Sequence, residues 1–452
     1  MRKFLLPVAV LLVASALLFT LNADFRQAIR TAMGRLGGTA PATQQDSGLG
    51  SPPALAAGQA PALPQPGPLA EPRSLEQIGL PRTLTDSIIP KGSLTPAAVA
   101  LGEKLFFERR LSGNGTVSCA SCHNPVRAFT DGRPTSIGIH GCVGQRNSPT
   151  LLNAMYNKSQ FWDGRAPTLE AQAALPITDP CESGLASVTA AVSRIAKDPA
   201  YRSGFKSVYG HDPNGTDLLR ALATYERTLM SFGSPFDRFI AGDKTAISAS
   251  AQRGWKLFND KARCNLCHAL TATKADPTLF TDNIFHNIGI GIIRHNVVAL
   301  AQKARREIAS GQLQQVDTAA INSELSVVGR FLLTKSSADI AAFKTPDIRN
   351  VMVTAPYFHD GSQMTLWDVM DHYNKGDGLK NPWLDTDIQP LALGEREIDD
   401  LVALMASLTS PQYRKLGDQE FARQRAIAKV RRPQRDTKRA FGPKPKQPPI
   451  PH

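Results

Sequence analysis

The pattern Cys-x-x-Cys-His occurs twice in this 452-residue chain, at residues 119–123 and 264–268. It is the attachment signature of c-type haem: both thiols bond to one edge of the porphyrin, and the following imidazole lies beneath the iron. A lone Cys-x-x-Cys also occurs in dithiol redox sites and zinc sites, but two copies that end in histidine favour haem. We therefore expect two covalently bound c-type haems, held by Cys119, Cys122, Cys264 and Cys267, with His123 and His268 as proximal iron ligands.

The segments before the two motifs are similar, which predicts a repeated helical module. Residues 97–107 and 251–258 both have helical spacing, and both contain Gly-x-x-Leu-Phe before the cysteine pair. Strand signals are sparse and the loops are long, and further helices are predicted over residues 188–197, 217–230, 366–372 and 398–408. The expected fold class is mainly α: two cytochrome c-like helical haem domains with long loops and little β structure.

The N-terminus carries an export signal. Met1-Arg2-Lys3 precedes a mostly apolar run over residues 4–21, and no convincing cleavage site follows it. The run is long for a signal peptide and just long enough to span a bilayer, so residues 1–23 are an uncleaved anchor, which we favour, or a signal peptide. Both interpretations place the rest of the chain in the periplasm, and the first anchors it to the inner membrane.

Composition divides the rest of the chain. Residues 24–74 are a Pro/Ala/Gly-rich linker, residues 75–245 and 246–411 are the N-terminal and C-terminal haem domains, and residues 412–452 are a basic, Pro-rich tail. Most of the formal net charge of +13 lies at this end, because residues 411–452 hold twelve Lys or Arg and three acids. This indicates a solvated, disordered tail, or a contact with anionic lipid or an acidic redox partner; nucleic acid is not an expected partner.

The haem motifs leave two of the six cysteines unused, Cys142 and Cys181. In an oxidising compartment we expect a disulfide between them. Two unrelated buried thiols are the alternative.

The distal ligand of each iron decides what the haem can do. A haem with two strong protein ligands only transfers electrons, whereas an open or displaceable sixth position admits peroxide. The chain has nine histidines, and composition does not choose a distal ligand among those outside the two motifs.

Several longer motifs resemble those of the bacterial di-haem cytochrome c peroxidases and their MauG-type relatives, in the family's order over residues 85–410. They are Ser118-Cys-Ala-Ser-Cys-His123, Arg146-Asn-Ser-Pro-Thr-Leu-Leu-Asn153, Gln160-Phe-Trp-Asp-Gly-Arg165, Ser234-Pro-Phe-Asp-Arg-Phe239, Phe343-Lys-Thr-Pro-Asp-Ile-Arg-Asn350 and Thr354-Ala-Pro-Tyr-Phe-His-Asp-Gly361. Such long matches in this order are very specific.

The resemblance implies that the haem on His123 is the peroxidatic one. Glu182 matches the family's distal glutamate, a general acid–base for O–O cleavage, and Gln172 matches an amide that positions peroxide. His140 lies where many members keep a histidine that caps this iron until the other haem is reduced. Its loop departs from the family pattern and contains Cys142, so a cap and a permanently open site are both retained as alternatives.

The resemblance also implies two features between the haems. Trp162 matches a tryptophan that relays electrons or holes. Asn147, with the main chain of Thr354 and Pro356, matches a calcium site, and oxygen ligands of this kind suit a hard cation.

The second haem departs from the bacterial peroxidases, which supply a methionine as its second ligand. The matching position is Tyr373, as in the MauG type. A phenolate stabilises oxidised iron and should lower the haem potential. The nearby alternatives are Met364, Met370 and His372.

We therefore expect a periplasmic di-haem peroxidase that reduces hydrogen peroxide with electrons from a small cytochrome c or cupredoxin. One alternative is a MauG-like enzyme that oxidises a protein side chain through a high-valent di-haem state. Another is a non-catalytic electron-transfer cytochrome with both irons six-coordinate. The sequence does not name the donor or protein substrate, and it leaves the choice between monomer and homodimer open.

Overall fold

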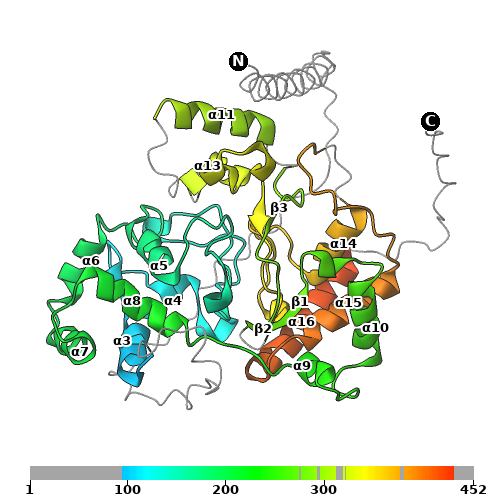
Figure 1. The fold of residues 1–452 in the computed structure, drawn as a ribbon, viewed down its shortest axis with the longest axis horizontal. Helices are drawn as coiled ribbons and strands as arrows, with labels where there is room; N and C mark the ends of the chain where they lie inside the picture. Colours follow the sequence, from blue (N-terminus) through cyan, green and yellow to red (C-terminus); the bar gives the residue numbers. More distant parts are fainter. Residues whose placement is uncertain are drawn as a thin grey trace, which may run out of the picture. The chain divides into compact units, whose positions relative to one another are not determined.

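The structure is a computed structural model that describes residues 94–273, 276–292, 296–311, 319–320, 322–376 and 381–431, all within one compact unit. The expected signal segment (1–23) and linker (24–74) lie outside these residues. Helices dominate the described chain, which confirms the mainly α fold class (Figure 1). No helix among the described residues is long and apolar enough to cross a bilayer.

The helices fall into a first and a second half of the chain. Those of the first half are α3 (Pro96–Phe106), α4 (Cys119–Cys122), α5 (Leu169–Thr178), α6 (Val188–Ile195), α7 (Pro199–Tyr209) and α8 (Gly215–Glu226). Those that follow are α9 (Pro235–Ile240), α10 (Ala249–Asn259), α11 (Val297–Ala309), α13 (Phe331–Thr334), α14 (Leu366–Lys375), α15 (Glu395–Ser407) and α16 (Arg414–Arg431). Many begin behind a side-chain cap whose oxygen accepts a backbone N–H three residues on, as at Thr95, Ser187, Asn214, Ser248 and Thr365.

Strands are few in the described chain, in line with the sparse strand signals. β1 (Leu270–Thr273) pairs antiparallel with β2 (Asp276–Phe280). β3 (Phe285–His286) pairs antiparallel with β4 (Phe343–Lys344), with Phe285 opposite Lys344. The second sheet connects segments that are far apart in the sequence.

The helix that precedes each haem motif makes the same kind of crossing with a helix that follows it. α3 packs on α8, and α10 packs on α15. A Cβ atom on Gly102 would lie 2.0 Å from the carbonyl oxygen of Ala221, and one on Gly254 would lie 2.0 Å from that of Asp400. Only glycine allows backbones this close. The repeated Gly-x-x-Leu-Phe therefore marks a close helix crossing.

Each crossing is surrounded by its own hydrophobic core. Leu105 and Phe106 of α3 pack with Leu222 of α8 in the first core, and Phe258 of α10 packs with Leu401 of α15 in the second. A third cluster lies in a region that we call the bridging segment, the described residues between 296 and 341. It contains α11 and α13, which pack next to each other in Figure 1.

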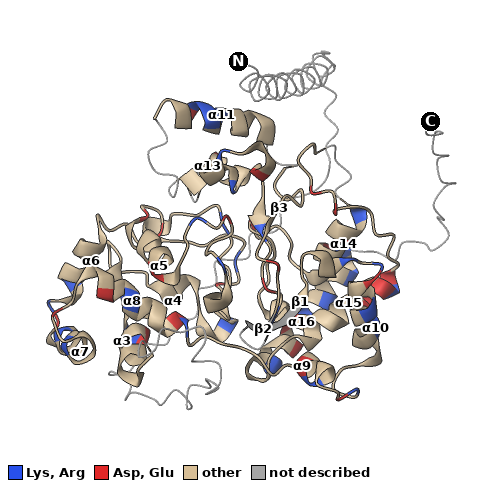
Figure 2. Cartoon of the chain, in the orientation of Figure 1, with Lys and Arg blue, Asp and Glu red and all other residues tan. Residues whose placement is uncertain are grey.

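The basic tail begins with an ordered helix, α16, which corrects the expectation of a disordered tail from residue 412. Gln424 is completely buried there. It accepts the N–H of Leu366 at 3.0 Å and donates to the carbonyl of Met352 at 3.1 Å. A polar side chain thus anchors this helix, which apolar patterning could not reveal. Figure 2 shows basic and acidic residues interspersed over the described helices, and residues 432–452 lie outside the description.

Candidate functional site

The first haem motif forms α4 and fixes the orientation of its histidine. Nδ1 of His123 lies 3.1 Å from the carbonyl oxygen of Phe129 and 3.2 Å from Oγ of Ser148. Burial lowers the pKa of His123 to about 4, so the imidazole is neutral. The proton is on the hydrogen-bonded Nδ1, and Nε2 is the nitrogen suited to bind iron.

The second motif repeats this arrangement in the 3₁₀ turn Cys264–Leu266 and the residues after it. Nδ1 of His268 lies 2.8 Å from the carbonyl oxygen of Phe280, and burial lowers the pKa of His268. None of the four motif cysteines takes part in a disulfide. Two free thiols and a neutral imidazole whose Nδ1 is already bonded are the donor set of a thioether-bound haem, so the residues present at each motif fit a c-type haem.

Glu182 lies beside the first haem motif, in the turn after α5. Burial and then the charge of Glu182 raise the pKa of the Cys122 thiol to about 12, which shows that the carboxyl group is close to this cysteine. The pKa of Glu182 itself is raised to about 7, first by burial and then by the charge of Asp179, while Arg165 opposes the shift. A carboxyl group with this pKa can both accept and release a proton near neutral pH.

Helix α5 and the turn after it carry both predicted pocket residues. Gln172 is partly buried on α5, and Glu182 follows the end of this helix. The chain then folds back, because the N–H of Ser183 donates to the carbonyl of Pro176 at 3.1 Å. This bond packs the turn against α5 and restricts the position of Glu182 relative to Gln172.

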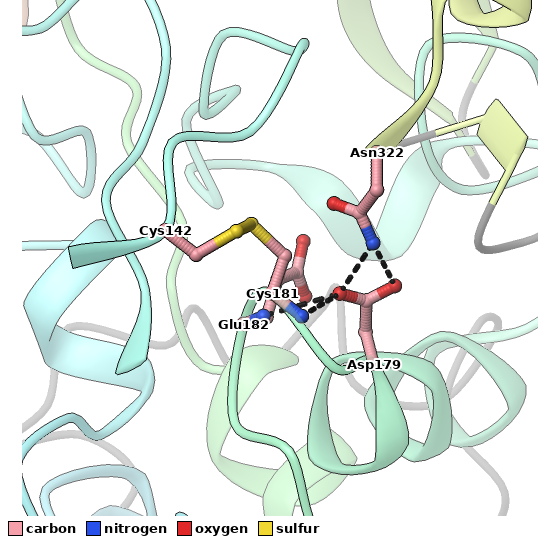
Figure 3. Close-up of a disulfide and its surroundings, with 5 residues drawn as sticks. All are labelled: Cys142, Asp179, Cys181, Glu182 and Asn322. Carbon is pink, nitrogen blue, oxygen red and sulfur yellow. Dashed lines mark hydrogen bonds between the residues drawn. A yellow bond between two sulfur atoms is a disulfide. The ribbon is translucent and has the colours of Figure 1, made fainter. Parts of the chain in front are cut away.

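Cys142 and Cys181 form a disulfide next to Glu182 (Figure 3). The N–H of Ile139 donates to the carbonyl of Glu182 at 3.0 Å. A Cβ atom on Gly138 would lie 1.8 Å from the carbonyl oxygen of Cys181, so glycine is required for this approach. Loop 138–142 is therefore joined to the Glu182 turn by a covalent bond, a backbone hydrogen bond and a close backbone contact.

His140 belongs to this loop and is exposed, with a positive φ of 55°. Its side chain therefore lies in solvent instead of in the buried surroundings of the first motif. Capping of the iron by His140 would require the loop to move. The disulfide and the bond from Ile139 to Glu182 oppose such a movement.

Trp162 and Asn147 lie where the two halves of the chain meet. Nε1 of Trp162 donates to the carbonyl of Asn147 at 2.9 Å, and the carbonyl of Trp162 accepts the N–H of Lys344 at 2.7 Å. The N–H of Asn147 donates to the carbonyl of His359 at 2.8 Å. The predicted relay residue is thus bonded to both the first half and β4 of the second.

The residues expected at the cation site are Asn147, Thr354 and Pro356. Asn147 is buried, and its side-chain amide donates to the carbonyls of Arg133 at 2.9 Å and Pro134 at 3.3 Å. Its backbone N–H bonds the carbonyl of His359, a residue that follows Thr354 and Pro356 along the chain. Side-chain amide and carbonyl oxygens are the donors that calcium prefers, so the residue types present fit the ion.

Tyr373 lies on α14 and packs against the second core. Burial and then the charges of the second motif's cysteines raise its pKa, which places the phenol beside that motif. Two of the nearby alternatives are engaged otherwise: Nε2 of His372 donates to the carbonyl of Ile288 at 2.8 Å, and Met370 is buried in the hydrophobic core. The third alternative, Met364, is partly buried, and ligation by Tyr373 stays a prediction.

Sequence reasoning missed one cluster of ionisable residues. His286 contacts Asp385 at 2.5 Å and Asp282 at 2.9 Å, and the sulfur of Cys267 lies within 4.8 Å of His286 and Asp282. The sulfur of Cys267 is the one expected to bond the second haem, so we assign no separate metal to this cluster. The sequence did not indicate this cluster, because Asp385 is far along the chain from the second haem motif.

Known proteins are similar to this chain over most of its described length. The model of the di-haem cytochrome c peroxidase family matches residues 96–245. Methylamine utilization protein MauG of Methylorubrum extorquens is 38% identical over 322 residues, which cover 71% of this chain and 80% of that protein. Cytochrome-c peroxidase IdrP1 of Denitromonas iodatirespirans is 37% identical over 327 residues, which cover 70% of this chain and 82% of that protein.

A solved structure extends the similarity to three dimensions. The crystal structure of a MauG-like protein associated with microbial copper homeostasis has a TM-score of 0.60 and 29% sequence identity. The match covers 74% of this chain and 95% of that one. Proteins named MauG and proteins named cytochrome c peroxidase thus match to a similar degree, and the comparisons do not separate the two subtypes.

Proposed function

Because the chain belongs to the di-haem cytochrome c peroxidase family, we propose that it is a periplasmic oxidoreductase that reduces hydrogen peroxide to water. The family implies two c-type haems, and the residues at both motifs fit them. The electrons come from a small cytochrome c or cupredoxin through the second haem and Trp162. The observation that carries this proposal is the partly buried Glu182, close to Cys122, with a pKa of about 7.

Glu182 is the proton-transfer group. Heterolysis of the O–O bond needs a proton moved from the inner to the outer peroxide oxygen. The carboxylate of Glu182 takes this proton and delivers it to the leaving oxygen, and the amide of Gln172 hydrogen-bonds the peroxide. When bound, the haem supplies the iron that receives the peroxide and the electrons that reduce it.

An iron held by His123 would keep its other face open to peroxide, because His140 is exposed and its loop is tied to the Glu182 turn. Visible and EPR spectra of the oxidised holoprotein test this. We expect one haem with a high-spin signal that changes when cyanide or peroxide is added. Two low-spin signals that neither ligand changes would identify an electron-transfer cytochrome and refute the enzyme.

Tyr373 favours a second candidate function, the MauG-like oxidation of a protein side chain. A buried phenol near the second motif, bound as phenolate, would favour the oxidised forms of that haem. We expect peroxide to change the spectra of both haems in the fully oxidised protein without prior reduction. A spectrum that stays unchanged until one electron is added would contradict ligation by Tyr373. Rapid, repeated oxidation of a reduced small cytochrome would favour the peroxidase over the MauG-like function.

Calcium is the proposed ion between the haems, held by Asn147 and the carbonyls of Thr354 and Pro356. The supporting observation is the hydrogen bond that joins Asn147 to the second half. Removal of calcium by a chelator should lower the rate of electron transfer between the haems, and added calcium should restore it. Metal analysis that finds no calcium in active holoprotein would exclude the site.

Periplasmic location rests on the sequence of residues 1–21 and on the disulfide, which forms in oxidising compartments. The proposal includes membrane contact, through residues 1–23 or through the basic end of the chain. It also includes a homodimer. Fractionation of cells with and without a salt wash separates an anchored, a peripherally bound and a free periplasmic protein.

A further inference from the structure

Asp179 connects the Glu182 turn to the rest of the molecule (Figure 3). Its Oδ1 accepts the backbone N–H of Cys181 at 2.8 Å and that of Glu182 at 3.1 Å. Its two carboxylate oxygens also accept from Nδ2 of Asn322, at 3.0 and 2.9 Å. Asp179 is only 5% exposed, so these protein groups, and not solvent, determine its orientation.

Asn322 approaches from the bridging segment, far along the chain from Asp179. Other polar contacts hold this segment on the first half: Nη1 of Arg330 donates to the carbonyl of Asp163 at 3.1 Å, and Arg146 donates to the carbonyl of Ser326. The contact between Asn322 and Asp179 belongs to this set, and it ends directly at the turn that carries Glu182.

We propose that Asp179 is a positioning residue for Glu182, and that Asn322 holds Asp179 in place from the second half of the chain. This inference rests on the proposed function, because it takes Glu182 as the proton-transfer group. Proton transfer is sensitive to displacements of about 1 Å. The turn is restrained on both sides, by the carboxylate of Asp179 and by the disulfide between Cys181 and Cys142.

The charge of Asp179 gives the experiment a second readout. It raises the pKa of Glu182, although less than burial does, and Arg165 lowers it. Asp179→Asn would keep an oxygen for the two backbone N–H groups while removing this charge. Oδ1 of Asn322 is buried with no partner in the described structure, so the Asn322 amide can turn over and accept from the new amide.

The test measures the rate of reaction with peroxide as a function of pH by stopped flow, in holoprotein that contains both haems. Asp179→Ala should lower the rate about 10- to 100-fold, and Asn322→Ala should lower it several-fold. Asp179→Asn should react within a few-fold of wild type, with the midpoint of its pH profile moved to lower pH. Asp243→Ala is the matched control, because this exposed aspartate also accepts a nearby backbone N–H, that of Thr245 at 3.0 Å.

A double variant shows whether Asp179 acts through Glu182. Asp179→Ala combined with Glu182→Gln should be no slower than Glu182→Gln alone. A wild-type rate in Asp179→Ala beside a slow Glu182→Gln would overturn this inference and leave the proposed function intact. Equal losses in Asp179→Ala and Asp179→Asn with an unmoved pH midpoint would also overturn it, because a purely structural role predicts that result. A wild-type rate in Glu182→Gln would instead overturn the proposed function and this inference with it.

Discussion

The two halves of the chain hold a haem in the same way and differ in what they present to its iron. In each half a glycine in the helix before the haem motif allows close contact with a later helix, and a backbone carbonyl orients the proximal histidine. The first half adds a restrained turn with Glu182, and the second adds Tyr373 against a hydrophobic core. The scaffold is therefore repeated, and the difference in chemistry lies in the segments that follow each motif.

Replacement of Glu182 should produce the largest difference between the halves. Glu182→Gln removes the proton-transfer group, so the rate of the peroxide reaction should fall about 10²- to 10⁴-fold, with the potential of the second haem unchanged. In the wild type the rate should rise as pH passes about 7, because the ionised carboxylate accepts the proton. The stopped-flow rate of the variant should lose this rise, and a variant that kept it would assign the titration to another group.

Tyr373→Met makes the second half similar to the bacterial peroxidases and should raise its haem potential by a sizeable part of the ~0.8 V range that axial ligands span. The reason is that a thioether stabilises reduced iron better than a phenolate does. Spectroscopic redox titration measures both haems separately. Met370→Leu is the control and should change neither potential, whereas an unchanged potential in Tyr373→Met would exclude Tyr373 as a ligand.

The two glycine crossings should be equally sensitive to one methyl group. Gly102→Ala and Gly254→Ala each place a Cβ atom 2.0 Å from a carbonyl oxygen, and each should lower the free energy of unfolding by about 1–3 kcal/mol. Urea denaturation can be followed by the absorbance of each haem. Gly102→Ala should lower the midpoint seen at the first haem, and Gly254→Ala the midpoint seen at the second. In the control Gly204→Ala, the new Cβ atom meets only the Leu101 side chain at 3.3 Å, and stability should be kept or slightly raised. Equal stability in all variants would show that the crossings are not tight.

Ser148→Ala tests a smaller difference between the halves. The proximal histidine of the first half has two neighbours at Nδ1, Phe129 and Ser148, whereas a carbonyl is the partner described for His268. Loss of the hydroxyl should make His123 a slightly weaker donor and raise the potential of the first haem by an amount worth about 1 kcal/mol or less. The potential of the second haem should stay constant, and a shift there would contradict the local origin of the effect.

Much of the fold was predictable because its signals are local. The two haem motifs identify the modules with ten residues, and apolar spacing predicted α3 and α10 to within a few residues. Tyr373 was predicted from its place in a family motif, and the structure puts it near the second motif.

Other parts could not be predicted, because they depend on single polar residues that meet across the chain. Nothing in the residues near Asn322 or Asp179 indicates their contact, since a lone amide carries no periodic signal. Helix α16 was missed for a similar reason. Most of its residues are polar, and the buried amide of Gln424 holds it in place.

The disulfide between Cys142 and Cys181 imposes a condition on biosynthesis. In the proposed periplasmic location, two of the six cysteines have to pair while the other four must stay reduced until a porphyrin reaches them. Thiol oxidation and cofactor ligation therefore compete during maturation. In a production host with strong oxidants and too little haem, chains would accumulate with non-native disulfides. Such chains would contain neither the Cys142–Cys181 bond nor haem.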